Sequence, residues 1–301
     1  MTATTTARPR LAPTRLRPFT TLAGIEAGRM LRHPAPWIGS LLWLAAGYAV
    51  LASAPGWSSA QYQGLQASVV FLAAGVSVAS AYAAARHRVG LAEDAPLPAE
   101  DRAAAQIVGG LGLVALVALV VVAGALWLRW SGGVPLGSEP GRTLHAHFSV
   151  PELLQPVALS AFAVAAGAAA VRLLRHPLAA SIALFVLWFV AGPAYWTLNG
   201  PVLRWFAPVM VQPYNVDVAP ASTDPLTLPP TWLLEGPGPY QPFWARLVVQ
   251  PELAAWHDLY LVALALLATA VALPGRYRRP LLFGGLVLAV ATVLLQARVN
   301  P

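Results

Sequence analysis

The sequence predicts an all-α integral membrane protein, a polytopic bundle of six or seven transmembrane helices that follows an N-terminal amphipathic interfacial helix. Three observations predict this class. Of the 301 residues, 57% are hydrophobic and only 10% are charged, whereas soluble domains carry about 25% charged residues. Seven apolar stretches reach or approach the roughly 20 residues that a helix needs to cross the hydrocarbon core. Arginines stand beside most of these stretches, as is typical of membrane topology signals.

The chain divides into three parts. Residues 1–17 are rich in Thr, Pro and Arg and are expected to be disordered, and residues 18–35 are expected to form the amphipathic helix. Residues 36–298 form the predicted transmembrane domain. Its expected spans are residues 37–54, 64–85, 103–128, 156–171, 178–198, 259–273 and 281–297. The fourth span and the last two are short, so the number of crossings stays open between six and seven.

The arginines predict the orientation. All 19 basic residues are Arg, and an excess of positive charge marks the cytoplasmic side of a membrane protein. With the N-terminus inside, 14 arginines fall on the inner side and 5 on the outer side. The net charge of +7 is therefore interpreted as a topology signal, and no nucleic-acid partner is expected. Seven spans would place the C-terminus outside, and six would place it inside.

Two repeated tripeptides mark expected helix starts. Arg-His-Pro occurs at 32–34 and 175–177, and Pro-Glu-Leu at 151–153 and 251–253. Proline is favoured in a first helical turn, where its missing N–H costs little. An acidic residue is favoured there by the helix dipole. Each tripeptide is thus expected just before or within the first turn of a span, with Arg-His-Pro on the inner side and Pro-Glu-Leu on the outer side.

The predicted connections differ in length and polarity. The outer loops are residues 130–150 and 199–256, and the second contains "PVLRWFAPVMV" and "PFWARLVV". These two pieces are expected to be short interfacial helices, with Trp205, Trp232 and Trp244 at headgroup level. The inner loop, residues 86–104, is expected to hold a short helix that Pro96 ends. Its Glu100 and Asp101 would open the third span.

Several kinds of chemistry are excluded or disfavoured. The sequence contains no Cys, which excludes thiol catalysis and Cys-ligated metals. It has no G-x-x-x-x-G-K-[ST] phosphate-binding loop. The predicted spans hold no ionisable residue, which disfavours an ion-coupled carrier, because such a carrier binds its coupling ion at membrane depth. The Gly-rich piece at 109–112 is interpreted as a helix-packing feature.

Two other function classes remain open. The first is a membrane-embedded enzyme acting on a lipid-linked substrate. Its candidate residues would be Glu139, His145, His147, Glu152, His257 and Asp258. His145 and His147 share a side only in an extended chain, and without a third ligand they are weak candidates for a metal site. The second class is a scaffold subunit that transports nothing.

Four features together resemble the membrane subunit of a type-2 ABC exporter, the ABC-2 permease family, in its actinobacterial form. The first is the amphipathic stretch "FTTLAGIEAGRMLRHPAPW" before the first span. The second is the Arg-flanked inner loop "RHRVGLAEDAPLPAEDR". The others are the large outer segment before the sixth span and the charge-free spans. The resemblance covers most of the chain, although the family usually has six spans.

The resemblance implies a role for the inner loop and the N-terminal helix. In the family, a coupling helix in this loop docks on an ATPase subunit. Carried over, this contact would fall to Arg86, Arg88, Gly90, Leu91, Glu93 and Asp94, with Glu26, Arg29 and Arg32 nearby. The chain would be a permease in a bacterial plasma membrane, paired with a second permease subunit that is the same or a different chain. ATP and Mg²⁺ would bind the partner ATPase, and this chain would catalyse no reaction.

Overall fold

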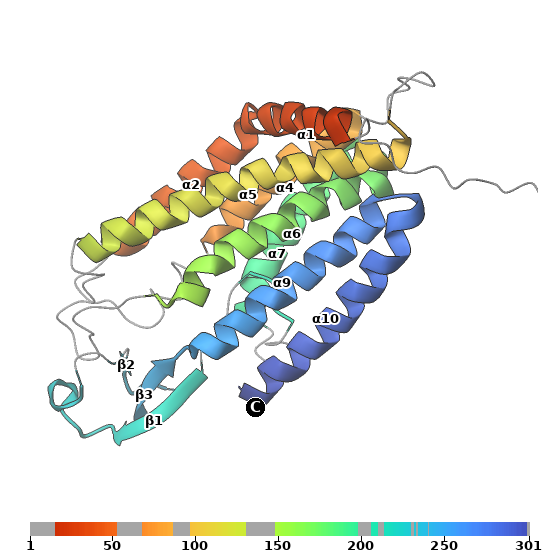
Figure 1. Cartoon of the computed structure of the whole chain (residues 1–301). Helices are drawn as coiled ribbons and strands as arrows, with labels where there is room; N and C mark the ends of the chain where they lie inside the picture. The colour runs from red at the N-terminus through yellow and green to blue at the C-terminus, as the bar shows by residue number, and fades with distance from the viewer. Residues whose placement is uncertain are drawn as a thin grey trace, which may run out of the picture.

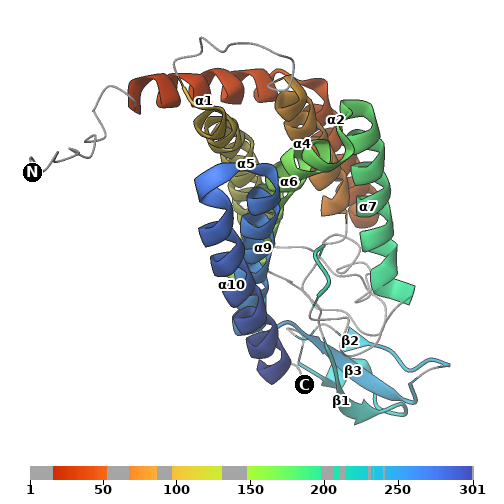
Figure 2. The same ribbon diagram turned by 90° about the vertical axis from the view of Figure 1, so that its right-hand side faces the viewer.

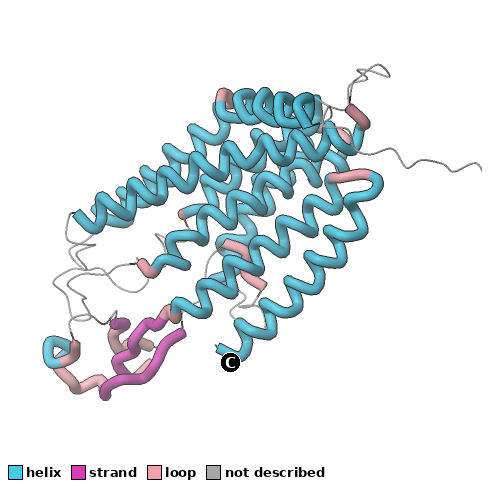
Figure 3. Tube along the Cα trace, viewed as in Figure 1, coloured by secondary structure: helices cyan, strands magenta, loops and turns pink. Residues whose placement is uncertain are grey.

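The computed structural model describes residues 16–52, 68–86, 97–130, 148–197, 206–209, 214–229, 232, 234–239 and 241–299. These residues contain a helical bundle and, at one end of it, a small β-sheet (Figures 1 and 3). The bundle is formed by α2 (Pro34–Ala52), α4 (Val69–Arg86), α5 (Ala99–Trp130), α6 (Val150–Leu174), α7 (Pro177–Thr197), α9 (Pro251–Ala272) and α10 (Arg278–Val299). Helix α1 (Leu16–Leu31) lies across the end opposite the sheet (Figure 2).

The helices are those of a multi-pass membrane protein. Among the described residues, α4, α5, α6, α9 and α10 are each long and apolar enough to cross a membrane. Four of them are longer than the sequence predicted, including α6, α9 and α10, whose predicted spans were short. The short segments that favoured six crossings are therefore parts of longer helices. Helix α10 brings the C-terminal end of the described chain to the sheet end of the bundle (Figure 2), although the number of crossings stays a prediction.

Local start signals fixed the helix boundaries as predicted. Helices α2 and α7 begin at Pro34 and Pro177, the prolines of the two Arg-His-Pro tripeptides. Helices α6 and α9 carry Glu152 and Glu252 in their first turns, and α5 opens with an acidic first turn. Both boundaries of the N-terminal helix differ slightly from prediction. It begins at Leu16, within the tail that was expected to be disordered, and it ends at Leu31 rather than at residue 35, because the first Arg-His-Pro separates α1 from α2.

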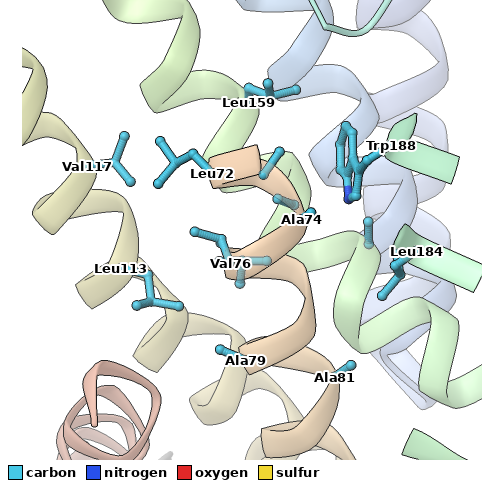
Figure 4. Packing of buried hydrophobic residues seen from close by; sticks show 14 of the residues in the cluster. Leu72, Ala74, Val76, Ala79, Ala81, Leu113, Val117, Leu159, Leu184 and Trp188 are labelled. Atoms are coloured by element: carbon cyan, nitrogen blue, oxygen red, sulfur yellow. The ribbon is translucent and has the colours of Figure 1, made fainter. Parts of the chain in front are cut away.

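Helix α4 lies at the centre of the packing, and two thirds of it is buried. Its side chains meet those of α5, α6 and α7 in one apolar cluster that includes Leu72, Val76, Leu113, Leu159 and Trp188 (Figure 4). Buried hydroxyls are paired within it. Trp188 Nε1 donates to Ser77 Oγ over 3.1 Å, and Ser80 Oγ donates to the Val164 carbonyl over 2.6 Å. Pairing matters because an unsatisfied polar group costs several kcal/mol, on the order of 4–8, in an apolar medium.

Glycines let α4 approach its neighbours closely. A Cβ on Gly39 of α2 would lie 2.6 Å from the Phe71 carbonyl oxygen and 3.2 Å from Gly75 Cα. A Cβ on Gly167 of α6 would collide with the Ser77 carbonyl oxygen. Small residues at such crossings allow the van der Waals contact that holds transmembrane helices together. The Gly-rich piece at 109–112 has the predicted packing role, because it meets α1 and α6.

The outer segment differs from prediction. The piece "PFWARLVV" forms strand β3 (Phe243–Val248), not an interfacial helix. It pairs antiparallel with β1 (Tyr214–Pro220) and β2 (Leu234–Glu235), in the order β1-β3-β2. Trp244 is buried in the small core of this sheet, and its Nε1 donates to the Thr223 carbonyl over 3.0 Å. Of the other piece, "PVLRWFAPVMV", the structure describes residues 206–209, which are not helical, whereas Trp205 lies outside the described residues.

The start of the helix that contains the sixth predicted span differs from prediction. Helix α9 begins at Pro251, so His257 and Asp258 lie inside it rather than at its mouth. His257 is only 1% exposed, and its Nδ1 lies 3.3 Å from Gln296 Oε1 of α10. The apolar stretch ends at these polar residues, but the backbone remains helical on both sides of them.

We expect Gly167→Ala to destabilise the bundle by about 1–3 kcal/mol, because the new methyl group overpacks the α4–α6 crossing. The control is Gly124→Ala in α5, where a Cβ would meet nothing within 4 Å and the higher helix propensity of Ala should stabilise slightly. Thermal unfolding of both variants in one detergent, followed by circular dichroism, measures the difference. Equal unfolding midpoints for the two variants would show that α4 and α6 can move apart to accept the methyl group without loss of stability.

Candidate functional site at the α1 end of the bundle

Positive charge gathers at the end of the bundle that α1 crosses. Ten of the thirteen described arginines lie there, and three lie toward the sheet end. The ten are Arg17, Arg29, Arg32, Arg86, Arg102, Arg172, Arg175, Arg276, Arg278 and Arg279. Because helix directions alternate, arginines far apart in the sequence meet on one side. This end would be the cytoplasmic one by the positive-inside rule.

A buried glutamate joins α1 to α4 at this end. The side chain of Glu26 is fully buried, and its Cβ packs over Gly109 of α5. Its Oε1 lies 2.6 Å from a guanidinium nitrogen of Arg29 on the same helix, and its Oε2 lies 3.8 Å from one of Arg86, the last residue of α4. Both arginine side chains are about half exposed. Three of the residues predicted for the partner contact are thus held in one ion-pair cluster.

His33 connects the same cluster to the start of α2. Its Nδ1 accepts a hydrogen bond from the Ala35 backbone N–H over 3.2 Å, which is the bond an N-cap side chain makes. Its ring lies 5.2 Å from that of Tyr82 on α4, between centroids. Burial, and then the positive charge of Arg86, lower the pKa of His33 below the usual 6.5. The neutral imidazole is therefore the form that caps α2.

A second ion-pair cluster ties α5 to the turn between α9 and α10. This turn contains η3 (Gly275–Tyr277). Arg276 donates to Asp101 Oδ1 over 2.8 Å, and the Tyr277 hydroxyl donates to the same oxygen over 2.9 Å. The Arg276 backbone N–H donates to Glu100 Oε2 over 3.1 Å. Sequence reasoning placed Glu100 and Asp101 at the helix start but missed this pairing, because 175 residues separate the partners.

The two clusters flank the predicted coupling loop. One contains Arg86, the last described residue before the loop, and the other is centred on the first turn of α5, just after it. Of the predicted contact residues, Arg88, Gly90, Leu91, Glu93 and Asp94 lie outside the described residues. Arg32 is described and exposed. The described residues at the two ends of this loop are thus tied to α1 through Glu26, and to the turn between α9 and α10 through Asp101.

Of the six residues proposed for an enzyme, the structure describes Glu152, His257 and Asp258. Glu139, His145 and His147 lie outside the described residues. Glu152 accepts hydrogen bonds from the Ser149 backbone N–H and hydroxyl, which makes it part of the capping box of α6. Within the described ranges, no group of three His, Cys, Asp or Glu side chains is placed to hold a metal ion.

We expect Glu26→Gln to lower the free energy of unfolding by about 1–3 kcal/mol, because it leaves two guanidinium groups beside a neutral amide. Glu252→Gln is the matched control, since Glu252 is an exposed glutamate at the other end of the bundle. Thermal or denaturant unfolding in one detergent compares the two variants. If the free energy of unfolding falls by the same small amount in both variants, the Glu26 cluster does not hold α1 on the bundle.

The lowered pKa of His33 predicts a pH dependence. The unfolded chain takes up a proton near pH 6.5 while the folded chain resists it, so stability falls as the pH drops below about 6.5. The variant His33→Asn keeps a capping side chain but does not titrate. Between about pH 7.5 and 5.5, the wild type should lose stability relative to this variant. Parallel curves of unfolding midpoint against pH would contradict the capping role of the neutral ring.

Comparison of the chain with protein-family models, with curated proteins and with solved structures finds no match.

Proposed function

We propose that this chain is the membrane-spanning permease subunit of an ATP-driven exporter of the ABC-2 type. In this proposal the chain forms part of the substrate path in a bacterial plasma membrane, with its N-terminus in the cytoplasm. A separate ATPase subunit binds ATP and Mg²⁺, and a second permease subunit, the same or a different chain, completes the path. The chain itself performs no reaction, and the other function classes are outcomes of the test below.

The linkage at the α1 end carries the proposal. An exporter driven by a separate ATPase needs a surface on which the ATPase pushes and a rigid connection from that surface to the spans. Arg86 links the start of the inner loop to the buried Glu26, whose Oε2 lies 3.8 Å from its guanidinium group. Asp101 forms a second link through Arg276. Both connections are ion pairs between segments that lie far apart in the sequence.

Exposed apolar faces are consistent with a second permease subunit or with lipid around the bundle. Helices α2, α7 and α10 expose several large hydrophobic side chains, such as Leu41, Phe185 and Phe283. Exposed apolar patches of this kind on a soluble protein would mark an aggregation-prone surface. In a multi-pass membrane protein they are the surface that faces lipid or another transmembrane subunit.

One observation favours a second candidate function, an ion-coupled carrier. His257 is buried inside α9, and no hydrogen-bond partner lies within reach of its Nε2 among the described residues. The same holds for Gln296 Nε2. Ionisable groups buried in transmembrane helices commonly serve proton or ion pathways. Ion-coupled transport would need no ATPase partner. The requirement for an ATPase therefore distinguishes the two candidate functions.

Copurification with an ATPase tests the proposal. A tagged chain extracted in mild detergent is expected to retain an ATPase subunit, and the complex should turn over ATP. The double reversal Glu93→Arg/Asp94→Arg should lower the retained ATPase about fivefold or more, because it places like charges at the contact. The exposed Asp217→Arg on β1 is the control for a change of charge far from the loop, and it should retain ATPase as the wild type does.

Three outcomes would contradict the proposal. One is a folded chain that retains no ATPase and adds no ATP turnover to its membranes. Another is full ATPase retention by the double reversal, which would count against the placement of the contact. The third is proton movement across chain-containing vesicles that needs no ATP and is lost in His257→Ala. That result would support the ion-coupled carrier instead.

A further inference from the structure

A partly enclosed pocket of about 150 Å³ opens between α4, α5, α6 and α9 at the α1 end of the bundle. One face of α5 lines it with Ala99, Arg102, Ala103 and Gln106, and α6 contributes Arg172. The small side chains of the alanines that line the pocket leave this space open. A cavity that holds one water molecule needs only about 10–15 Å³. The pocket is therefore large enough for a polyatomic group.

The charge of the pocket favours an anion. Two of its lining residues carry guanidinium groups, and none of the lining residues that the structure describes is acidic. Gln106 adds an amide, whose nitrogen donates to the Ser80 carbonyl over 3.4 Å. The neighbouring acids face elsewhere, because Glu100 and Asp101 hold Arg276. The C-terminal ends of α6 and α9 also border the pocket. Each contributes about half a negative charge, which does not offset two full positive charges.

The donors suit a phosphate group in particular. A guanidinium offers five N–H donors in a planar fork that matches phosphate oxygens. One nitrogen of Arg102 donates to the Leu97 carbonyl over 2.7 Å, which fixes the side chain while its other donors remain. The pocket also lies at the first turn of α5, whose N-terminal end favours negative charge.

We propose that this pocket binds a phosphate group, held between Arg102 and Arg172. A phosphate could come from the headgroup of an anionic lipid, because basic pockets between transmembrane helices bind such headgroups. It could equally come from a soluble phosphate compound. The proposal does not depend on the ATPase partnership, because it rests on the pocket and its charges alone.

The test compares ligands on the full chain in a neutral detergent. Phosphatidylglycerol, phosphatidylcholine or inorganic phosphate is added, and the thermal unfolding midpoint is measured. Ligand that binds the folded state raises this midpoint. We expect phosphatidylglycerol to raise it by at least about 3 °C and phosphatidylcholine to leave it unchanged. An equal rise with inorganic phosphate would assign the site to a soluble phosphate rather than a lipid.

Variants locate the effect. Arg102→Gln/Arg172→Gln should abolish the rise, whereas the control Arg278→Gln/Arg279→Gln removes as much charge from exposed positions at the same end and should keep it. If the first variant fails to fold, Ala103→Leu fills the pocket without removing charge and should also abolish the rise. A rise that survives in the pocket variants, or that is absent from the wild type with every phosphate probe, would overturn the proposal.

Discussion

Close contact between helix backbones at α4 is the constraint on which the rest of the structure depends. Apolar side chains gain little by leaving lipid for one another, so transmembrane helices associate through close packing and hydrogen bonds. Gly39, Gly75 and Gly167 supply the first by removing the atoms that would separate α2, α4 and α6. Ser77 and Ser80 supply the second. With α4 fixed in this way, its last residue, Arg86, has a defined position beneath α1.

Much of the fold could be predicted because its signals are local. A proline and an acid in a first turn, or an Arg-His-Pro before an apolar run, act within a few residues, and they located the starts of α2, α5, α6, α7 and α9. The sheet could not be predicted in this way, since β3 pairs with β1 across some twenty intervening residues. The true length of α9 was not predicted, because the hydropathy of the sequence drops at His257 and Asp258. The helix continues through these residues.

For the candidate site, only its position at one end of the bundle and its general charge could be predicted. Counting arginines placed Arg29, Arg86 and Arg276 at one end, and the structure brings them to that end. Arg29 meets Glu26 on the same helix, three residues earlier. The carboxylates that Arg86 and Arg276 meet depend on tertiary packing. Glu26 was expected at an exposed contact surface, but α1 turns it inward onto Gly109. The pocket between Arg102 and Arg172 likewise arises from the meeting of four helices, which no single segment encodes.

The junction between α6 and α7 has a mechanical consequence. Only Arg175 and His176 separate the two helices. Arg175 adopts a left-handed backbone with φ of 60°, and its N–H closes the end of α6 on the Val171 carbonyl. His176 Nδ1 accepts from the Ala179 N–H at the start of α7. Because this two-residue connection is short and hydrogen-bonded to both helices, neither helix can shift along its axis independently of the other at this end. Any displacement of the C-terminal end of α6 would therefore also displace the start of α7.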